Sequence, residues 1–339
     1  MTAAASARPV LAINGLTTVF PGENGPTVIV DDISLSVSRG ETLAVVGESG
    51  SGKTMTFHAA LGLVPRPGRV EKGEVLLDGI DLMTLSSDAL RRRRGAEIAI
   101  VFQDPLTALN PVFTIGDQIC EVLRAHLSLS KTAARKRAIE TLARVHIPDP
   151  HRRVDDYPHQ FSGGMRQRAL IAMAIALGPK VLIADEPTTA LDVSVQAQVL
   201  ELLGDLKRES GMGLVLITHD LGVVARHADH VAVLYAGRVM EQGPADQVFE
   251  TPRHPYTVSL FRSIPHLDTV AGKDLTPIEG MPPNPAMLPK GCAFEPRCFL
   301  GHGKDDCRTR RPALEPTEDQ EHRTRCWRWR ELATSVAPA

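Results

Sequence analysis

The 339-residue sequence predicts an α/β protein with a parallel sheet, and three short apolar runs carry this prediction. The runs are Leu43–Val46, Val181–Ala184 and Leu214–Ile217, and each leads into glycine or polar residues. Continuous runs rich in Val, Ile and Leu are typical of strands that are buried on both faces. Stretches with helical spacing of apolar residues, at 53–66 and 192–209, separate or flank these runs.

Further elements are expected on both sides of this core. Residues 8–46 alternate apolar and polar side chains around a Gly/Pro break, which predicts antiparallel strands. Residues 106–178 are expected to be mostly helical. The sequence LYAGRVMEQG predicts a hairpin with its turn at Ala236 and Gly237.

A glycine-rich loop follows the first apolar run and reads G-x-x-x-x-G-K-T. Its glycines let consecutive backbone N–H groups turn inward around phosphate, and the helix that follows presents its positive end. Lys53 is expected to reach the β- and γ-phosphates, and the Thr54 hydroxyl to bind Mg²⁺. The nucleotide-binding residues expected here are Gly47, Glu48, Ser49, Gly50, Ser51, Gly52, Lys53 and Thr54. Alternating elements around this loop predict a RecA-like P-loop NTPase core.

Charged and polar residues end the other two apolar runs. Asp185 at a strand end suits a direct or water-mediated contact to Mg²⁺, and Glu186 can polarise water for attack on the γ-phosphate. His219 ends the third run, where parallel sheets gather their ligand groups. An intact P-loop beside these residues favours ATP hydrolysis.

Composition excludes several functional classes. The formal net charge is −2, so no basic field predicts nucleic-acid binding. The longest apolar run, ALIAMAIAL, is far shorter than the roughly 18–20 residues that span a bilayer. The N-terminal MTAAASARPV has no apolar core of a secretory signal, so we expect a cytosolic chain whose membrane role comes through partners.

The segment YPHQFSGGMRQRALIAMAIAL and the other motifs together resemble those of a known protein family. Here the chain resembles the ATPase subunits of ABC transporters, over about residues 8–250. The resemblance implies that Ser162, Gly163 and Gly164 cap the γ-phosphate of ATP bound by an opposite subunit. It also implies an α-helical subdomain at 106–178 that carries this loop.

The resemblance assigns the remaining site residues. Gln103 in VFQDP matches the Q-loop, Asp192 in TALD the D-loop, His219 the switch histidine, and Phe20 the aromatic residue that stacks on adenine. The catalytic residues expected are Glu186, His219 and Gln103, and the expected Mg²⁺ ligands are Thr54, Gln103 and Asp185.

Three departures from the family pattern are small. Thr189 stands where many relatives have Ser, the signature reads Phe161 to Met165 as FSGGM, and Phe20 replaces the commoner Tyr. None removes a group expected to contact phosphate.

The C-terminal residues 251–339 differ in composition. Six prolines lie between Pro265 and Pro289, which excludes regular helix or central strand. Four of the five cysteines follow, with the spacing C-x5-C-x8-C-x18-C. Spacing alone leaves zinc and an iron–sulfur cluster open, since structural zinc usually shows C-x2–4-C pairs. The four residues are Cys292, Cys298, Cys307 and Cys326.

The segments HPYT, IEGMPPNP and GCAFEPRC resemble the C-terminal extension of dipeptide and oligopeptide importer ATPases. The resemblance favours a 4Fe-4S cluster on the four thiols, with Zn²⁺ as the alternative. Five arginines are expected to offset its negative charge: Arg297, Arg308, Arg310, Arg325 and Arg328. A structural or redox-sensing role is expected, because nothing in the sequence ties the tail to the ATP site.

The resemblance implies a nucleotide-binding domain at 1–250, and an extension at 251–339 that contains the cysteine module at 290–330. The function implied is an ATPase that energises import of peptides or related solutes. Implied partners are two membrane-spanning permease subunits, a second ATPase subunit (a paralogue rather than a copy) and an extracytoplasmic solute-binding protein, with the chain peripheral to the cytoplasmic face of the inner membrane. Import of nickel or another solute, a soluble non-transport ABC ATPase, and a nucleotide-switched metal sensor are the alternatives.

Overall fold

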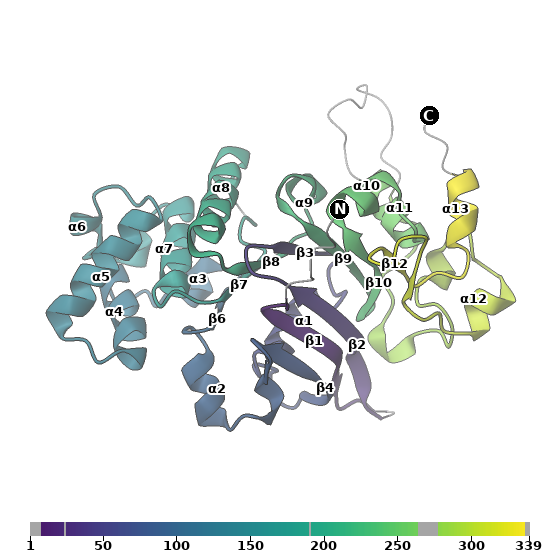
Figure 1. The fold of residues 1–339 in the computed structure, drawn as a ribbon, viewed down its shortest axis with the longest axis horizontal. Helices are drawn as coiled ribbons and strands as arrows, with labels where there is room; N and C mark the ends of the chain where they lie inside the picture. The colour runs from purple at the N-terminus through teal and green to yellow at the C-terminus, as the bar shows by residue number, and fades with distance from the viewer. Residues whose placement is uncertain (1–7, 24, 190, 264–276, 336–339) are drawn as a thin grey trace. The chain divides into compact units, whose positions relative to one another are not determined.

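A computed structural model describes residues 8–23, 25–189, 191–263 and 277–335. The chain divides into two compact units, and each unit consists of three separate segments of the sequence. Unit 1 contains Met1–Leu11, Val37–Thr42 and Leu77–Ile217. Unit 2 contains Ala12–Ser36, Leu43–Leu76 and Thr218–Ala339. Figure 1 traces the chain through both.

Unit 1 is built on three parallel strands in the order β8-β7-β6. They are β6 (Ile98–Val101), β7 (Val181–Asp185) and β8 (Gly213–Ile217). Every residue of β7 and β8 is buried, as the continuous apolar runs predict. This confirms the predicted strands at these two runs.

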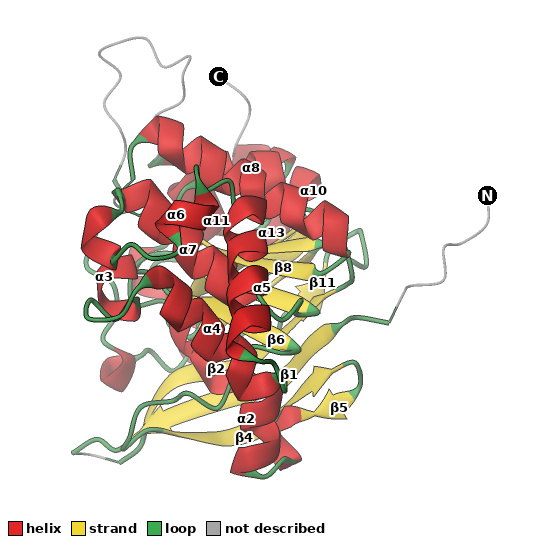
Figure 2. Ribbon diagram, turned by 90° about the vertical axis from the view of Figure 1, so that its left-hand side faces the viewer, coloured by secondary structure: helices red, strands yellow, loops and turns green. Residues whose placement is uncertain are grey.

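Helices make up most of the rest of unit 1 (Figure 2). Helices α4, α5 and α7 pack against one another, and α7 also packs on β6 and on α8. The elements of this unit are β5 (Ile80–Asp81), α2 (Ser87–Arg93), α3 (Pro105–Ala108), α4 (Ile115–His126), α5 (Lys131–Arg144), α6 (Pro150–Arg153), α7 (Gly163–Ile175) and α8 (Val193–Ser210), with 3₁₀ turns at Leu82–Thr84 and Pro158–Gln160.

Unit 2 contains two groups of strands. In the first the order is β2-β1-β4, and in the second it is β11-β12-β10-β9-β3. β3 pairs with β9 in parallel, and β9 and β10 form an antiparallel hairpin whose turn is Ala236–Gly237, as predicted. The strands are β1 (Leu11–Phe20), β2 (Thr27–Val37), β3 (Thr42–Val46), β4 (Arg69–Leu77), β9 (His230–Tyr235), β10 (Arg238–Pro244), β11 (Glu315–Pro316) and β12 (Arg323–Thr324).

Short helices complete unit 2. They are α1 (Lys53–Ala60), α9 (Leu221–His227), α10 (Ala245–Glu250), α11 (Pro255–Arg262), α12 (Asp305–Thr309) and α13 (Trp329–Ser335), with 3₁₀ turns at Pro285–Met287 and Glu295–Arg297. The predicted helix over 53–66 is wrong in length. Gly62 is left-handed (φ 62°), and prolines follow at 65 and 67, so α1 ends at Ala60.

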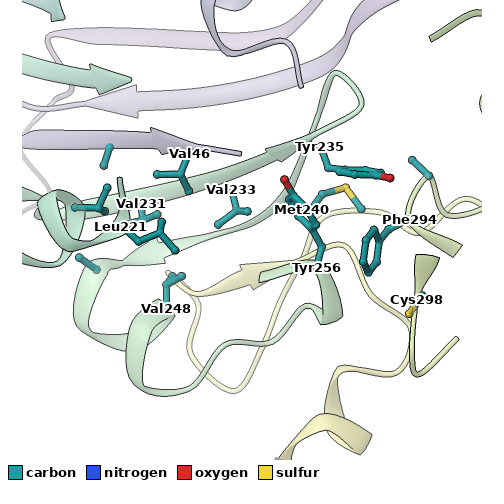
Figure 3. Packing of buried hydrophobic residues seen from close by; sticks show 14 of the residues in the cluster. Val46, Leu221, Val231, Val233, Tyr235, Met240, Val248, Tyr256, Phe294 and Cys298 are labelled. Atoms are coloured by element: carbon teal, nitrogen blue, oxygen red, sulfur yellow. The ribbon is translucent and has the colours of Figure 1, made fainter. Parts of the chain in front are cut away.

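The C-terminal extension shares one apolar core with the strands of unit 2 (Figure 3). Tyr235 of β9 packs against Tyr256 of α11 with ring centroids 4.6 Å apart, and Phe294 meets the two rings at 5.3 and 5.2 Å. All three rings are fully buried or nearly so. Buried aromatic contacts of this kind make the extension part of the fold of unit 2.

A buried carboxylate adds polar contacts to this packing. Glu241 of β10 has no exposed surface and accepts the backbone N–H groups of Arg253 and His254, at 2.5 and 2.9 Å. A hydrogen bond of 2.7 Å joins it to His322 Nε2. His254 Nδ1 in turn accepts the N–H of Tyr256 at 3.0 Å.

The proline-rich stretch predicted between 265 and 289 lies partly outside the described residues, and from 277 to 289 the only regular piece described is the 3₁₀ turn Pro285–Met287. Within the described ranges, no helix combines the length and apolar character that a membrane span requires.

His254 predicts how stability depends on pH. Burial lowers the pKa of His254 from 6.5 to about 3, although a hydrogen bond with the Arg325 backbone opposes this shift and outweighs the effect of the Arg325 charge. Below pH 6.5 the His254 side chain therefore binds a proton in the unfolded chain but stays neutral in the folded chain. The contribution of neutral His254 to the free energy of unfolding is fully present above pH 6.5 and is lost as the pH falls. As the pH falls from about 6.5 to about 4, we expect the free energy of unfolding to decrease by up to about 1.4 kcal/mol per pH unit because of His254.

Tryptophan fluorescence during urea unfolding measures this effect, because both tryptophans, Trp327 and Trp329, lie in the extension. His254→Asn is the control, since its side-chain oxygen can accept the same Tyr256 N–H without titrating. An equal pH slope in the two proteins would contradict the assignment.

Candidate active site

The P-loop in unit 2 has a backbone that only glycine can adopt at its start. Gly47 has φ 149°, and a Cβ there would lie 2.1 Å from the carbonyl oxygen of Leu234 in β9. Gly50 and Gly52 are left-handed, at φ 78° and 98°. The loop therefore passes in close contact with the backbone of β9, and α1 begins directly after it, as the motif predicts.

Lys53 lies at the centre of this loop. Its ammonium donates to the carbonyl oxygens of Gly47 and Glu48, at 2.8 and 3.0 Å, and to the Ser51 hydroxyl at 3.5 Å. The side chain is only 6% exposed. A positive charge is thus held within the glycine-rich loop, next to the N-terminus of α1, as phosphate binding requires.

Two other predicted residues belong to unit 2. Phe20 ends β1, and its ring lies against Gly68 so closely that a Cβ there would come within 2.5–2.8 Å of three ring carbons. His219 is exposed. It follows Thr218, whose N–H donates to the carbonyl oxygen of Val45, two residues before the P-loop, at 3.2 Å.

Unit 1 holds the predicted catalytic carboxylate in a fixed position. Gln103 Nε2 donates to Glu186 Oε2 at 2.8 Å, and the Thr189 hydroxyl donates to the same oxygen at 2.9 Å. Glu186 itself has φ 46°, a strained conformation for a non-glycine residue that often marks functional sites. Its neighbour Asp185 is 2% exposed at the end of β7.

Thr189 is a residue whose part in the site the sequence did not reveal. The sequence shows it only as a departure from the family pattern. It lies three residues after Glu186, in a turn closed by the Thr189 N–H and the Glu186 carbonyl oxygen at 3.2 Å, and no sequence pattern marks a hydroxyl in such a turn.

The predicted signature residues begin a helix. Ser162 caps α7 by accepting the Met165 N–H at 3.3 Å, and Ser162 and Gly163 are exposed. A Cβ on Gly164 would lie 2.5 Å from Val195 Cγ1, so this glycine lets α7 pack against α8. The exposed N-terminus of a 13-residue helix suits phosphate binding.

Asp192 has a local structural task. Its carboxylate accepts the Ser194 hydroxyl at 2.6 Å and the Val195 N–H at 3.0 Å, which caps α8. These hydrogen bonds lower the pKa of Asp192, and the bond from Ser194 has the largest effect. A D-loop role for this residue stays a prediction.

The expected site residues are thus shared between the units. Unit 2 contains the P-loop, Phe20 and His219, and unit 1 contains Gln103, Asp185, Glu186, the signature residues and Asp192. Of the three predicted Mg²⁺ ligands, Thr54 lies in unit 2 and the other two in unit 1. Their joint role stays a prediction.

The four C-terminal cysteines line one pocket. Cys292, Cys298 and Cys307 are buried and Cys326 is half-buried, and none is in a disulfide. A Cβ on Gly301 would lie 3.0 Å from Cys307 Sγ and 3.4 Å from Cys298 Sγ, so these two thiols flank one glycine. In the part of the chain that the structure describes, no group of three or more His, Cys, Asp or Glu side chains is arranged to hold a metal ion.

Burial keeps these thiols protonated near neutral pH. It raises the pKa of Cys292 to about 11 and raises the pKa values of the other three. Binding any metal centre here would therefore release protons.

Of the five arginines expected to offset the negative charge of a cluster, Arg328 is the one that lines the thiol pocket. Arg328 lies beside Cys307 and lowers its pKa against the larger effect of burial. The others bind elsewhere, because oxygen atoms and rings lie closer to them: Arg308 pairs with Asp305, Arg310 lies over Trp327, Arg325 donates to Val239 and Pro312 carbonyl oxygens, and Arg297 pairs with Glu48.

The contact between Arg297 and Glu48 also overturns the expectation that nothing ties the tail to the ATP site. The Arg297 guanidinium donates to both carboxylate oxygens of Glu48, a P-loop residue, at 2.7 and 3.0 Å. The sequence could not show this pairing, because 249 positions separate the two residues.

Comparison with known proteins agrees with this geometry. Residues 30–189 match the model of the ABC transporter family, and residues 240–307 match that of the oligopeptide/dipeptide transporter C-terminal region. A putative peptide import ATP-binding protein of Brucella melitensis biotype 1 is 49% identical over 97% of this chain and 99% of its own length. The oligopeptide transport ATP-binding protein OppD of Bacillus subtilis (strain 168) is 50% identical over 84% of this chain and 80% of its own.

Solved structures give the same result. A dimeric bacterial ABC transporter cassette is 30% identical, covers 69% of this chain and 98% of its own, and has a TM-score of 0.62. The same cassette in a post-hydrolysis state with ADP and Pi is 29% identical over the same shares, with the same TM-score. With its P-loop NTPase cassette and this C-terminal region, the chain belongs to the ABC transporter family, among its peptide-import ATP-binding proteins.

Proposed function

We propose that this chain is the ATP-hydrolysing subunit of an importer for peptides or related small solutes. One observation carries the catalytic part: Gln103 and Thr189 both donate to one carboxylate oxygen of Glu186, directly after the buried Asp185. A carboxylate fixed in this way can orient water for in-line attack on a γ-phosphate. The relatives named for peptide, oligopeptide and dipeptide transport support the cargo class.

The roles proposed for the ATP site follow from this chemistry. The P-loop N–H groups and Lys53 bind the phosphates, and Phe20 stacks on adenine. Thr54, Gln103 and Asp185 hold Mg²⁺ directly or through water, and His219 contacts the γ-phosphate as charge develops. Ser162–Gly164 and Asp192 act on ATP bound by a second ATPase subunit, a role that the dimeric cassette supports.

The division of the chain and its partners complete the proposal. Residues 1–250 form the nucleotide-binding domain, with a helical subdomain at about 106–178, and residues 251–339 form the extension. The chain works at the cytoplasmic face of the inner membrane with two permease subunits, a paralogous ATPase subunit and an extracytoplasmic solute-binding protein.

Glu186→Gln tests the proposal in the assembled transporter. The amide keeps the side-chain size but cannot draw a proton from water, so we expect ATP affinity within about threefold of the wild type and hydrolysis slower by about 10²–10⁴-fold. Uptake of a labelled dipeptide into proteoliposomes should fail with it. The measurements are ATP binding, phosphate release and uptake.

Glu201→Gln is the matched control, because Glu201 is an exposed glutamate on α8 in the same unit. It should leave all three measurements unchanged. Retention of most of the turnover by Glu186→Gln would remove Glu186 from the catalytic role. If the wild-type transporter took up a nickel complex and no peptide, the proposed peptide cargo would be wrong.

We also propose that Cys292, Cys298, Cys307 and Cys326 hold a 4Fe-4S cluster. The chemistry of the residues supports this proposal: all four thiols line one pocket, and thiolates are the usual cluster ligands, although the thiols are not arranged around a metal ion in this structure. The group would cross-link the extension, whose segments are short and rich in turns. Zn²⁺ is the alternative that the experiment must separate.

Anaerobic purification followed by iron, sulfide and zinc analysis tests this proposal. We expect about four irons and four sulfides per chain, lost in Cys298→Ser and kept in Cys120→Ser, whose thiol lies in α4 of unit 1. One zinc and no iron would leave a zinc module. A folded protein with neither metal would refute both.

A further inference from the structure

Glu48, the second residue of the P-loop, is held by two side chains of the C-terminal extension. Its carboxylate accepts two hydrogen bonds from Arg297, at 2.7 and 3.0 Å. Its backbone N–H donates to the hydroxyl of Tyr256 at 2.9 Å. One P-loop residue is therefore fixed through both its side chain and its backbone.

Arg297 is a rigid partner. Its side chain is 5% exposed, against 23% for that of Glu48, so this pair is partly shielded from water. The guanidinium also donates to the carbonyl oxygens of Ile278 and Glu279, at 3.2 and 2.9 Å, and to the Tyr235 hydroxyl at 3.3 Å. Although burial opposes it, bonding to Glu48 and Tyr235 raises the pKa of Arg297, so its charge is permanent. A two-point contact of this kind sets direction as well as distance.

Tyr256 is equally fixed. It has no exposed surface and packs against Tyr235 and Phe294, as Figure 3 shows. Burial raises the pKa of its hydroxyl, which stays protonated. The ring cluster therefore holds the hydroxyl oxygen at the position where it accepts the Glu48 N–H.

These contacts bear on phosphate binding in two ways. Lys53 Nζ bonds the carbonyl oxygens of Gly47 and Glu48, so a shift of Glu48 moves the anchor of the phosphate-binding ammonium. A carboxylate without a cation beside it would also place a negative charge on a loop that must receive a more highly charged anion.

We propose that Arg297 and Tyr256 are positioning residues for ATP binding: they hold the P-loop through Glu48, and Arg297 cancels the charge that Glu48 would otherwise set against the phosphates. Arg297 lies between Cys292 and Cys298, so the segment that carries the thiols also carries this support. The inference rests on the contacts within unit 2 and does not need a metal centre.

Neutralising Arg297 alone, and then Arg297 together with Glu48, tests this proposal in the full chain. Arg297→Gln leaves Glu48 negative and unpaired, so we expect ATP to bind at least tenfold more weakly, with KM raised and kcat nearly unchanged. Adding Glu48→Gln removes the offending charge and should restore the Kd to within about threefold of the wild type. Tyr256→Phe, which keeps the ring packing, should weaken binding about threefold. Equilibrium binding of a fluorescent ATP analogue measures each Kd.

Arg311→Gln is the matched control. Arg311 belongs to the same extension and forms an ion pair with Asp31 of β2 (3.2 Å), not with Glu48 of the P-loop. It should change neither Kd nor KM. Thermal unfolding of every variant separates loss of fold from loss of binding. If Arg297→Gln does not fold, Arg297→Met and Arg297→Met with Glu48→Gln provide the same comparison, because methionine also removes the positive charge.

Two results would overturn the proposal. The first is an Arg297→Gln protein that binds ATP within twofold of the wild type. The second is a double variant that binds no more tightly than Arg297→Gln, because a purely structural contact predicts that two substitutions do not cancel.

Discussion

The extension keeps its place in unit 2 through Glu241, a carboxylate with no exposed surface. A buried carboxylate is costly unless donors surround it. Here the donors are the backbone N–H groups of Arg253 and His254 and the ring of His322, which lies far from them in the sequence. The position of α11, and with it that of Tyr256 and the ring cluster, follows from this satisfied carboxylate.

Crowding and backbone strain are found at a predicted site residue in each unit. At Gly47 the P-loop passes so close to β9 that no side chain fits, and at Glu186 a glutamate is held in a left-handed conformation. Both are costly locally and are maintained by the buried strands that flank them. The predicted phosphate-binding and catalytic residues thus follow the ends of buried strands, as expected for parallel sheets.

Local predictions from the sequence were largely confirmed, because they rest on adjacent residues. The buried strands, the helix at 192–209, the hairpin at Ala236–Gly237 and the glycines of the P-loop each follow from a short pattern. The helix from Lys53 is shorter than its apolar spacing predicts, because a left-handed glycine and two prolines follow it. The contact of Thr189 with Glu186 is not predictable from the sequence, because a hydroxyl in a turn has no pattern of its own.

What the sequence by itself determined is the chemistry of each motif: which backbone can turn tightly, which strand ends in a carboxylate, which helix has a serine or aspartate cap. These depend on steric and hydrogen-bonding preferences that act over a few residues. Only the tertiary structure decided that Arg297 pairs with Glu48 of the P-loop and not with the thiols that flank it in the sequence. The reason is physical: a long-range partner is chosen by the packing of buried rings and by the need to pair buried charges, and neither leaves a periodic trace in the sequence.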